Sequence, residues 1–317
     1  MGVRSLAIVH VTPSRGNTGA HRMNRLMYDL LGRHFNVKEY AFARGGTKQS
    51  ALYYPFYPLA RPLAEGLMRR NDVVFTEWSG YFPVPGDLTY MGPPTPPEGR
   101  TVPLRQLMGV GPRPARGFWP PPFEWLYYNP IVRPLFDRAA MNALDRIGTI
   151  LATGRTTQRQ ILEDFGRESR VVYPAIPAPE LAALVAMRSR PRSRRVLVIS
   201  RIVPVKHLED VLAIADRLPE VSFTVIGYLP AHGRAYLEQL RRRNRAGNVK
   251  FLPNLDEASK REYLSRSKVV VNPSRNDTLV IALLEAMAAG LAPVAHASGG
   301  PLEYLEPHQL YRTIDEA

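Results

Sequence analysis

Short apolar runs alternate with amphipathic stretches along most of the chain. Strand-like runs open both halves, at residues 6–11 (LAIVHV) and 195–200 (RVLVIS), and helical periodicity follows each of them. This alternation is expected of doubly wound α/β domains, in which helices connect parallel strands. Further strands are predicted at 37–42, 72–77, 147–153, 170–173, 221–226, 249–252 and 269–271, and helices at 21–31, 60–69, 135–144, 157–164, 208–218, 232–244, 256–265 and 279–289.

The pattern breaks between residues 82 and 134, where Pro, Gly and aromatic residues are dense. Proline is excluded from the interiors of regular helices and strands, and so long an irregular region inside a domain usually binds something. Residues 118–134 combine Trp119 and Trp125 with nearby arginines, a composition typical of membrane interfaces. A peripheral contact with an anionic membrane and a Pro-rich cover over the domain core both stay open.

A second break separates the two halves. Residues 174–177 (PAIP) follow a strand-like run, and residues 178–194 carry four arginines around two prolines. The length of 317 residues favours two domains of about 150 residues each. We therefore expect an N-terminal domain over residues 1–180 and a C-terminal domain over residues 181–317, with a linker in this region.

Composition narrows the classes of partner. With 42 Lys and Arg against 28 Asp and Glu, the net charge is +14, which favours phosphorylated substrates, anionic lipid surfaces or nucleic acid. A basic solvated surface explains the charge equally well. The absence of Cys excludes disulfides, thiolate metal sites and a Cys nucleophile. No run approaches the roughly 18 apolar residues of a membrane span, and the first run is too short for a signal peptide, so a cytoplasmic location is expected.

Two carboxylates lie around the start of one predicted helix. An apolar strand leads to Asp277, which is predicted to cap the helix at 279–289, and Gly290 ends that helix. At a rise of about 1.5 Å per residue, Asp277 and Glu285 lie roughly 12 Å apart along the axis. This separation suits the two ends of an extended ligand whose phosphates lie at the helix N-terminus.

Glu285 has apolar neighbours on this helix. They include Leu284, Ala286 and Met287, so the carboxylate needs a partner, and a ribose diol donates two hydrogen bonds without bringing a charge. An exposed helix position is the alternative for Glu285. Simple N-capping is the alternative for Asp277.

Two cations follow the strand at 195–200. Arg201 comes directly after it, and Lys206 precedes the helix at 208–218. Ligands bind at such strand ends in α/β sheets, and two cations there suit a diphosphate. Surface charges of a basic protein are the alternative. The seven His residues show no metal-ligand spacing.

These segments resemble two signatures of the family 4 retaining glycosyltransferases. One resembles the Glu-x7-Glu element, with Asp277 in place of the first Glu and Glu285 as the second. The other resembles the Gly-Arg-x4-Lys element, with Ser200 in place of Gly. The resemblance implies that Asp277 contacts the donor sugar and Glu285 the ribose of the nucleotide. It also implies that Arg201 and Lys206 neutralise the leaving nucleoside diphosphate.

The resemblance further implies a fold and a reaction. The fold is GT-B, with two Rossmann-like doubly wound domains facing each other across a cleft, the donor bound mainly by the second and the acceptor by the first. The reaction is transfer of a hexose from a nucleoside diphosphate sugar to an acceptor hydroxyl with retention of configuration. In this family the departing diphosphate helps to accept the acceptor's proton, so neither a side-chain base nor a metal is required. Residues 293–294 and 298–301 resemble the family's next strand and Gly-rich turn.

The stretch after the first carboxylate departs from the family. Family members carry Gly-Phe-Gly where Thr278, Leu279 and Val280 stand, and side chains there restrict both the backbone angles and the approach of the donor. We assign these three residues to donor binding, together with Ser200 and with Gly227 at a predicted strand end. Recognition of the donor sugar is thus the part of the site least like the family.

The first half offers further signals. Gly16 and Gly19, between the first strand and a helix, resemble the family's Gly-rich loop, and we assign them to donor binding. Residues 88–95 (LTYMGPPT) resemble a segment of the mannosyltransferases that extend lipid-linked oligosaccharides, which implies mannose and a lipid-linked or glycan acceptor. The acceptor-side candidates are His21, Tyr90 and Gly92.

Two other classes of function stay open. The departures at 278–280 and at Gly92 are compatible with a catalytically silent glycosyltransferase-like subunit that binds a nucleotide or a membrane partner. The charge and the arginine run at 241–243 are compatible with nucleic-acid binding. This last class ranks lowest, because no reading helix or aromatic RNA motif accompanies the charge.

Overall fold

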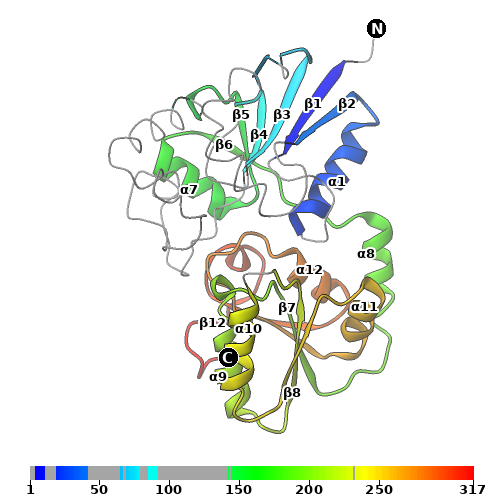
Figure 1. The fold of residues 1–317 in the computed structure, drawn as a ribbon, viewed down its shortest axis with the longest axis vertical. Helices are drawn as coiled ribbons and strands as arrows, with labels where there is room; N and C mark the ends of the chain where they lie inside the picture. The colour runs from blue at the N-terminus through cyan, green and yellow to red at the C-terminus, as the bar shows by residue number, and fades with distance from the viewer. Residues whose placement is uncertain are drawn as a thin grey trace. The chain divides into compact units, whose positions relative to one another are not determined.

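The chain forms two compact units, of which the first ends at Tyr173 and the second runs from Pro174 to Ala317 (Figure 1). The computed structural model describes residues 4–10, 19–41, 65–66, 69–78, 85–91, 142, 144–230 and 233–317. Each unit is built on one six-stranded sheet. All neighbouring strands in both sheets run parallel to each other.

The first sheet has the order β2-β1-β3-β4-β5-β6. Its strands are β1 (Ser5–His10), β2 (Asn36–Ala41), β3 (Val73–Trp78), β4 (Leu88–Met91), β5 (Thr149–Ala152) and β6 (Ser169–Val171). Helix α1 (Gly19–Leu31) packs Met27 and Leu31 against a core formed by Leu6, Ile8 and Phe75. Helix α7 (Arg155–Phe165) precedes β6, and its Ile161 is fully buried.

The second sheet has the order β12-β11-β10-β7-β8-β9. Its strands are β7 (Arg195–Ile199), β8 (Ser222–Gly227), β9 (Val249–Pro253), β10 (Val269–Asn272), β11 (Ala292–His296) and β12 (Leu310–Tyr311). The chain runs outward from β7 to β9 and then returns to place β10 on the other side of β7. In open parallel sheets, ligands bind beyond the carboxyl ends of the two strands where this reversal occurs. The topology therefore points to the ends of β7 and β10.

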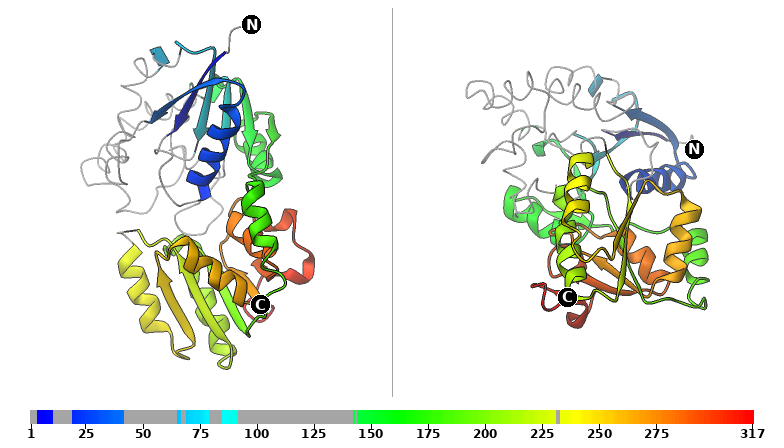
Figure 2. Two further views of the ribbon diagram at one scale, coloured as in Figure 1. Left: turned by 90° about the vertical axis from the view of Figure 1, so that its right-hand side faces the viewer. Right: turned by 60° about the horizontal axis from the view of Figure 1, so that its bottom comes forward.

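Helices cover both faces of the second sheet, as the right-hand view of Figure 2 shows. On one face lie α9 (Leu208–Arg217) and α10 (Arg234–Arg243), and on the other α8 (Ala178–Val185), α11 (Glu257–Arg266) and α12 (Ile281–Ala288). Alternate side chains of β7 pack against the helices on opposite faces of the sheet. Val196 and Val198 pack with α9 and α10, whereas Leu197 packs with α8, α11 and α12. Burial on both faces explains the unbroken apolar runs of the sequence.

The doubly wound α/β prediction is confirmed. The predicted strands correspond to β1, β2, β3, β5, β6, β7, β8, β9 and β10, and six of the predicted helices to α1, α7, α9, α10, α11 and α12, with small differences at their ends. The predicted helices at 60–69 and 135–144 lie mostly outside the described residues, and residues 118–134 lie wholly outside them. No helix in the described part of the chain is long and apolar enough to span a bilayer.

Strand β4 lies inside the region expected to be irregular. It pairs with β3 and β5, and the buried hydroxyls of Thr89 and Thr76 meet at 2.6 Å across the strand pair. The expectation of irregular structure is therefore wrong for Leu88–Met91. The strand is only four residues long, so the prolines on either side concealed it.

Helix α8 occupies residues where a linker was expected. It buries Leu184 on the face of the second sheet that α12 covers. The domain boundary was expected between residues 180 and 181, and this position falls within α8, a helix that packs on the second unit. The arginines that follow are also partly structural. Arg188 donates from Nε to the carbonyl of Ala288 at 2.9 Å, and Arg192 donates to the carbonyl of Ser267 at 2.6 Å.

Candidate functional site

An ion pair joins the two segments that leave the ends of β7 and β10. Lys206 ends a short 3-10 turn, Pro204–Lys206, after β7 and is 8% exposed. Its Nζ donates to Oδ2 of Asp277, which follows β10 by five residues. The two residues are 71 positions apart in the chain. The sheet topology therefore brings together two of the residues that the sequence singled out.

Asp277 is not the N-cap of the following helix. Helix α12 begins at Ile281, and its N-cap, Val280, makes no side-chain capping hydrogen bond. The predicted capping role is therefore wrong, and Asp277 and Glu285 do not lie on one helical run. The helix begins four residues after Asp277, and the Asp277 carboxylate pairs with Lys206 instead of capping it.

The Asp277 carboxylate stays ionised despite limited exposure. Its side chain is 17% exposed, and burial acts to raise its pKa, but the Lys206 ammonium and then the Arg201 guanidinium outweigh burial. The net result is a pKa below the ordinary Asp value. The site thus combines the negative charge of Asp277 with the positive charges of Lys206 and Arg201.

Two glycines fix the backbone on either side of Asp277. Gly299 has φ +66°, and a Cβ there would come within 2.3 Å of the Asp277 carbonyl oxygen. The Gly300 amide donates to that same oxygen at 2.8 Å, and a Cβ on Gly300 would lie 2.4 Å from the Thr278 carbonyl. Ser298 adds a hydroxyl that accepts from the Asn276 amide at 3.0 Å. The Gly-rich turn predicted at 298–301 therefore holds the segment that carries Asp277.

Glu285 lies on α12 and is only 1% exposed. Its Oε2 accepts from Nζ of Lys260 on α11 at 2.8 Å. A buried carboxylate is costly without such a partner. Lys260 is therefore a partner of the kind that the apolar neighbours of Glu285 predicted. Sequence reasoning missed Lys260, because it sits 25 residues earlier among other charged residues, and no periodicity links the two helices.

Arg201, Ser200 and Gly227 meet where β7 and β8 end. Arg201 is exposed, and the Ser200 hydroxyl donates to the Arg201 carbonyl at 3.2 Å. Gly227 has φ +146°, and a Cβ there would lie 1.9 Å from the Ser200 carbonyl oxygen. Only glycine allows the two strand ends to come this close, which gives Gly227 a structural role whether or not it also touches a ligand.

A second charged pair braces the β10 segment. Arg275 donates to Oδ2 of Asp210 on α9 at 3.1 Å, so the segment is tied to both the β7 exit and α9. His207 lies nearby, and burial, followed by the Arg275 guanidinium, lowers its pKa. His296 Nδ1 lies 2.9 Å from the Ser298 hydroxyl. Sequence reasoning did not single out Arg275 or Asp210.

The remaining donor-side residues of the second unit are half-buried. Thr278, Leu279 and Val280 bridge Asp277 and α12, and the Thr278 amide lies 3.1 Å from the Asp277 Oδ1 that accepts its hydrogen bond. Their role in donor binding stays a prediction.

The candidates of the first unit are only partly described. Gly16 and Gly92 lie outside the described residues, Gly19 begins α1, and His21 belongs to the same helix. Tyr90 is a core residue of β4, 6% exposed, whose hydroxyl donates to the Val172 carbonyl at 3.0 Å. That contact gives Tyr90 a packing role, and its acceptor-side assignment stays a prediction. Across the described ranges, no group of three or more His, Asp or Glu residues has the arrangement of a metal site.

The charged residues around the ends of β7 and β10 fall within one stretch of the chain that matches a known family. Residues 186–313 match the family model of the group 1 glycosyl transferases. This stretch begins after α8 and includes Arg201, Lys206, Lys260, Asp277 and Glu285. The matched stretch therefore contains all three ion pairs described above.

Two curated relatives align with part of the chain. Sulfoquinovosyl transferase SQD2 of Arabidopsis thaliana is 29% identical over 152 residues, which are 48% of this chain and 29% of that protein. D-inositol 3-phosphate glycosyltransferase of Mycolicibacterium gilvum is 28% identical over 188 residues, which are 54% of this chain and 41% of that protein. The chain thus spans less than half the length of either curated relative.

Solved structures resemble nearly the whole chain. Sucrose-phosphate synthase from Thermosynechococcus elongatus superimposes with a TM-score of 0.66 at 12% identity, covering 99% of this chain and 88% of that one. The Anabaena protein HepE, in complex with UDP, superimposes with a TM-score of 0.55 at 13% identity, covering 96% and 84%. At these identities the likeness concerns the fold alone. The fold is GT-B, built from two Rossmann-like α/β domains.

Proposed function

We propose that this protein is a retaining glycosyltransferase, which moves a sugar from a nucleoside diphosphate sugar to an acceptor hydroxyl. The observation that carries the proposal is the position of the Lys206–Asp277 pair. It lies beyond the ends of β7 and β10, where the strand order reverses, and ligands of open α/β sheets bind at that point. The pair also lies within the stretch that matches the group 1 glycosyl transferases.

Lys206 and Arg201 have free capacity for a diphosphate. An ammonium has three donors, and the bond to Asp277 uses one of them. Arg201 is exposed at the β7 exit, and its planar guanidinium can bind phosphate oxygens in pairs. Placed in advance around the leaving diphosphate, the two cations would stabilise the charge that develops as the sugar–phosphate bond breaks. Asp277 is then the group closest to the departing sugar.

Glu285 is the proposed ribose ligand. An ionised carboxylate has about four acceptor positions, and Lys260 takes one of them. The family that the sequence resembles uses the corresponding carboxylate to contact the ribose, whose hydroxyls donate hydrogen bonds to it. Lys260 acts as a positioning residue in this scheme, since its ammonium donates to the Glu285 carboxylate and orients it where α11 and α12 pack together.

The identity of the donor and of the acceptor is proposed from the comparisons and from the sequence. HepE is described in complex with UDP and with UDP-glucose, which makes UDP the first nucleotide to test. Mannose, a lipid-linked or glycan acceptor and membership of family 4 rest on the sequence resemblance. An association with anionic membranes rests on the aromatic and arginine composition of residues 118–134. We also propose that transfer requires no metal, because two protein cations already face the leaving group.

The proposal is tested by following transfer directly. The purified chain is incubated with UDP-glucose, UDP-galactose, GDP-mannose or UDP-N-acetylglucosamine and a polyprenyl-phosphate-linked sugar, with and without EDTA. Release of nucleoside diphosphate together with a larger acceptor supports the proposal. Lys206→Met should abolish this release. Glu238→Gln, which changes an exposed residue of α10, should leave it unchanged.

A catalytically silent subunit is the second candidate, favoured by Thr278, Leu279 and Val280 in place of small residues. Such a subunit would bind a nucleotide, and Glu285→Gln would weaken that binding. Neither sugar transfer nor hydrolysis of the donor would be detected with any donor. Failure of every nucleotide to bind would contradict both candidates.

A further inference from the structure

The outward face of α8 consists of apolar side chains. Ala178, Leu181, Ala182 and Val185 are all exposed, with Leu181 at 41% and Val185 at 43%. Leu184 points the other way and is buried. A helix on a protein surface normally carries polar residues on its outer face. This helix therefore lacks the solvated face that its position calls for.

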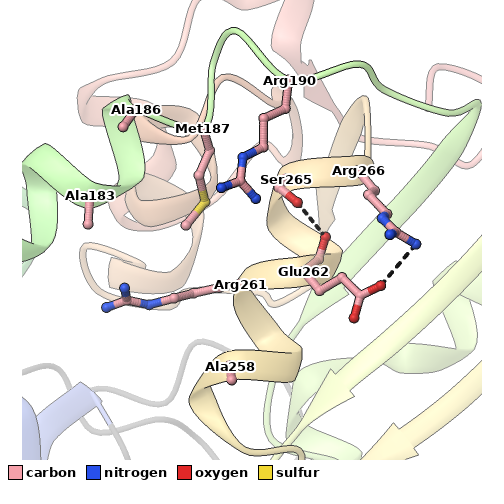
Figure 3. A pocket seen from close by; sticks show the side chains of 9 residues that line it. All are labelled: Ala183, Ala186, Met187, Arg190, Ala258, Arg261, Glu262, Ser265 and Arg266. Atoms are coloured by element: carbon pink, nitrogen blue, oxygen red, sulfur yellow. Dashed lines mark hydrogen bonds and ion pairs between the residues drawn. The ribbon is translucent and has the colours of Figure 1, made fainter.

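A pocket of about 470 Å³ adjoins this face, between α8 and α11. Its apolar lining includes Ala183, Ala186 and Met187, and the guanidinium-bearing side chains of Arg190 and Arg261 enter it from the turn after α8 and from α11 (Figure 3). Arg266 also lines the pocket, but its NH1 lies 2.9 Å from a Glu262 oxygen. An apolar floor under a cationic rim suits an amphiphile with an anionic head.

The arginines after α8 divide into two kinds. Arg188 and Arg192 turn inward and bond the carbonyl oxygens at the ends of α11 and α12, including Ala288. Arg190 belongs to the same run, yet within the described ranges its side chain has no ion-pair partner, and the same is true of Arg261. Glu262 also lines the pocket but pairs with Arg266, so the two like charges of Arg190 and Arg261 favour an external anion.

We propose that the α8–α11 surface, consisting of Leu181, Val185, Ala186, Arg190 and Arg261, docks the protein on an anionic phospholipid bilayer. Leu181 and Val185 enter the boundary between headgroups and acyl chains, where short amphipathic helices bind. Arg190 and Arg261 bind headgroup phosphates, to which guanidinium geometry is matched. The net charge of +14 draws the protein towards such a surface. This inference does not rest on the proposed transfer reaction.

Co-sedimentation with vesicles tests the proposal on the whole chain. Wild-type protein should bind vesicles of phosphatidylglycerol and phosphatidylcholine, and bind pure phosphatidylcholine much less. Arg190→Gln with Arg261→Gln should weaken binding roughly 30-fold, since each arginine near an anionic surface strengthens it about fivefold. The matched control, Arg242→Gln with Arg243→Gln on α10, removes the same charge elsewhere and should weaken binding less than about threefold.

The apolar part of the surface is tested in the same way. Leu181→Ser with Val185→Ser should weaken binding at least about tenfold. The control Leu218→Ser with Leu302→Ser changes two leucines that are 38% and 52% exposed, and should have little effect. Circular dichroism and melting temperatures confirm that all four variants fold.

Four results would overturn the proposal. One is an equal loss of vesicle binding in the α8–α11 and α10 arginine variants, which would mean that net charge alone explains the binding. Another is unchanged binding in both α8–α11 variants. A third is full release by millimolar inorganic phosphate at constant ionic strength, which would make the pocket a site for a free anion. A fourth is binding of an acidic peptide in place of vesicles.

Discussion

Replacing Lys206 by Met removes one half of the buried pair at the ends of β7 and β10. The side chains of Lys206 and Asp277 are 10% and 17% exposed, so the variant leaves a carboxylate with little water around it. Breaking a buried pair on one side costs about 3–5 kcal/mol. Because Asp277 keeps some exposure and Arg201 nearby, we expect about 3 kcal/mol. This loss corresponds to a fall of roughly 6–12 °C in the melting temperature of a unit of this size.

Urea unfolding followed by circular dichroism measures the change. The double variant Lys206→Met, Asp277→Leu should recover most of the loss, since replacing both partners by apolar residues removes the unpaired charge. Arg217→Gln breaks an exposed pair in which the side chains are 52% and 81% exposed, and should cost less than about 1 kcal/mol. A Lys206→Met variant as stable as wild type would refute the account of the pair.

The difference in unfolding free energy between wild type and Lys206→Met should change with pH in one direction only. The pKa of Asp277 is lowered in the folded protein, so its contribution is fully present above the unfolded-state value of about 4 and is lost as the pH falls towards the lower folded value. The difference in unfolding free energy between wild type and Lys206→Met should therefore shrink below about pH 4. A difference that grows as the pH falls would contradict the assignment.

Three further changes test the surroundings of the site. Arg192→Ala should destabilise the second unit by about 2 kcal/mol because it leaves helix-end carbonyls unpaired, whereas Arg190→Ala should not, and equal effects in urea unfolding would contradict this difference. Gly227→Ala should cost more than about 3 kcal/mol, while Gly247→Ala, also at positive φ but with nothing within 4 Å of its Cβ, should cost about 1 kcal/mol; similar losses would remove the close-approach argument. Lys260→Met should weaken nucleotide binding at least about tenfold, measured by calorimetry, and unchanged affinity would deny its positioning role.

The order of strands and helices was predictable because each depends on a local pattern. β7 and β10 are buried on both faces, which leaves continuous apolar runs in the sequence. Helix α8 carried its own signals as well, with Pro near its start and Glu180 in its first turn, but the arginines and proline after it outweighed them. β4 was missed because four residues between prolines give too short a pattern.

The site was predictable only in part, because its interactions cross the chain. Arg201, Lys206 and Glu285 could be singled out from their places at a strand end or on an apolar helix. Their partners could not be read from the sequence, since Lys206 reaches Asp277 over 71 positions and Lys260 reaches Glu285 over 25. A local rule assigned Asp277 as a helix cap, and a non-local ion pair overrode it.

The most direct test of the nucleotide site is a thermal-shift series with UDP, GDP and their sugar derivatives. A ligand present at about one hundred times its dissociation constant stabilises the native protein by about 2.7 kcal/mol, which raises the melting temperature by several degrees. We predict that at least one of these nucleotides does so for wild type and for Glu238→Gln, and that the rise disappears in Glu285→Gln. No rise with any nucleotide, or an equal rise in Glu285→Gln, would contradict a nucleotide-sugar site at the ends of β7 and β10.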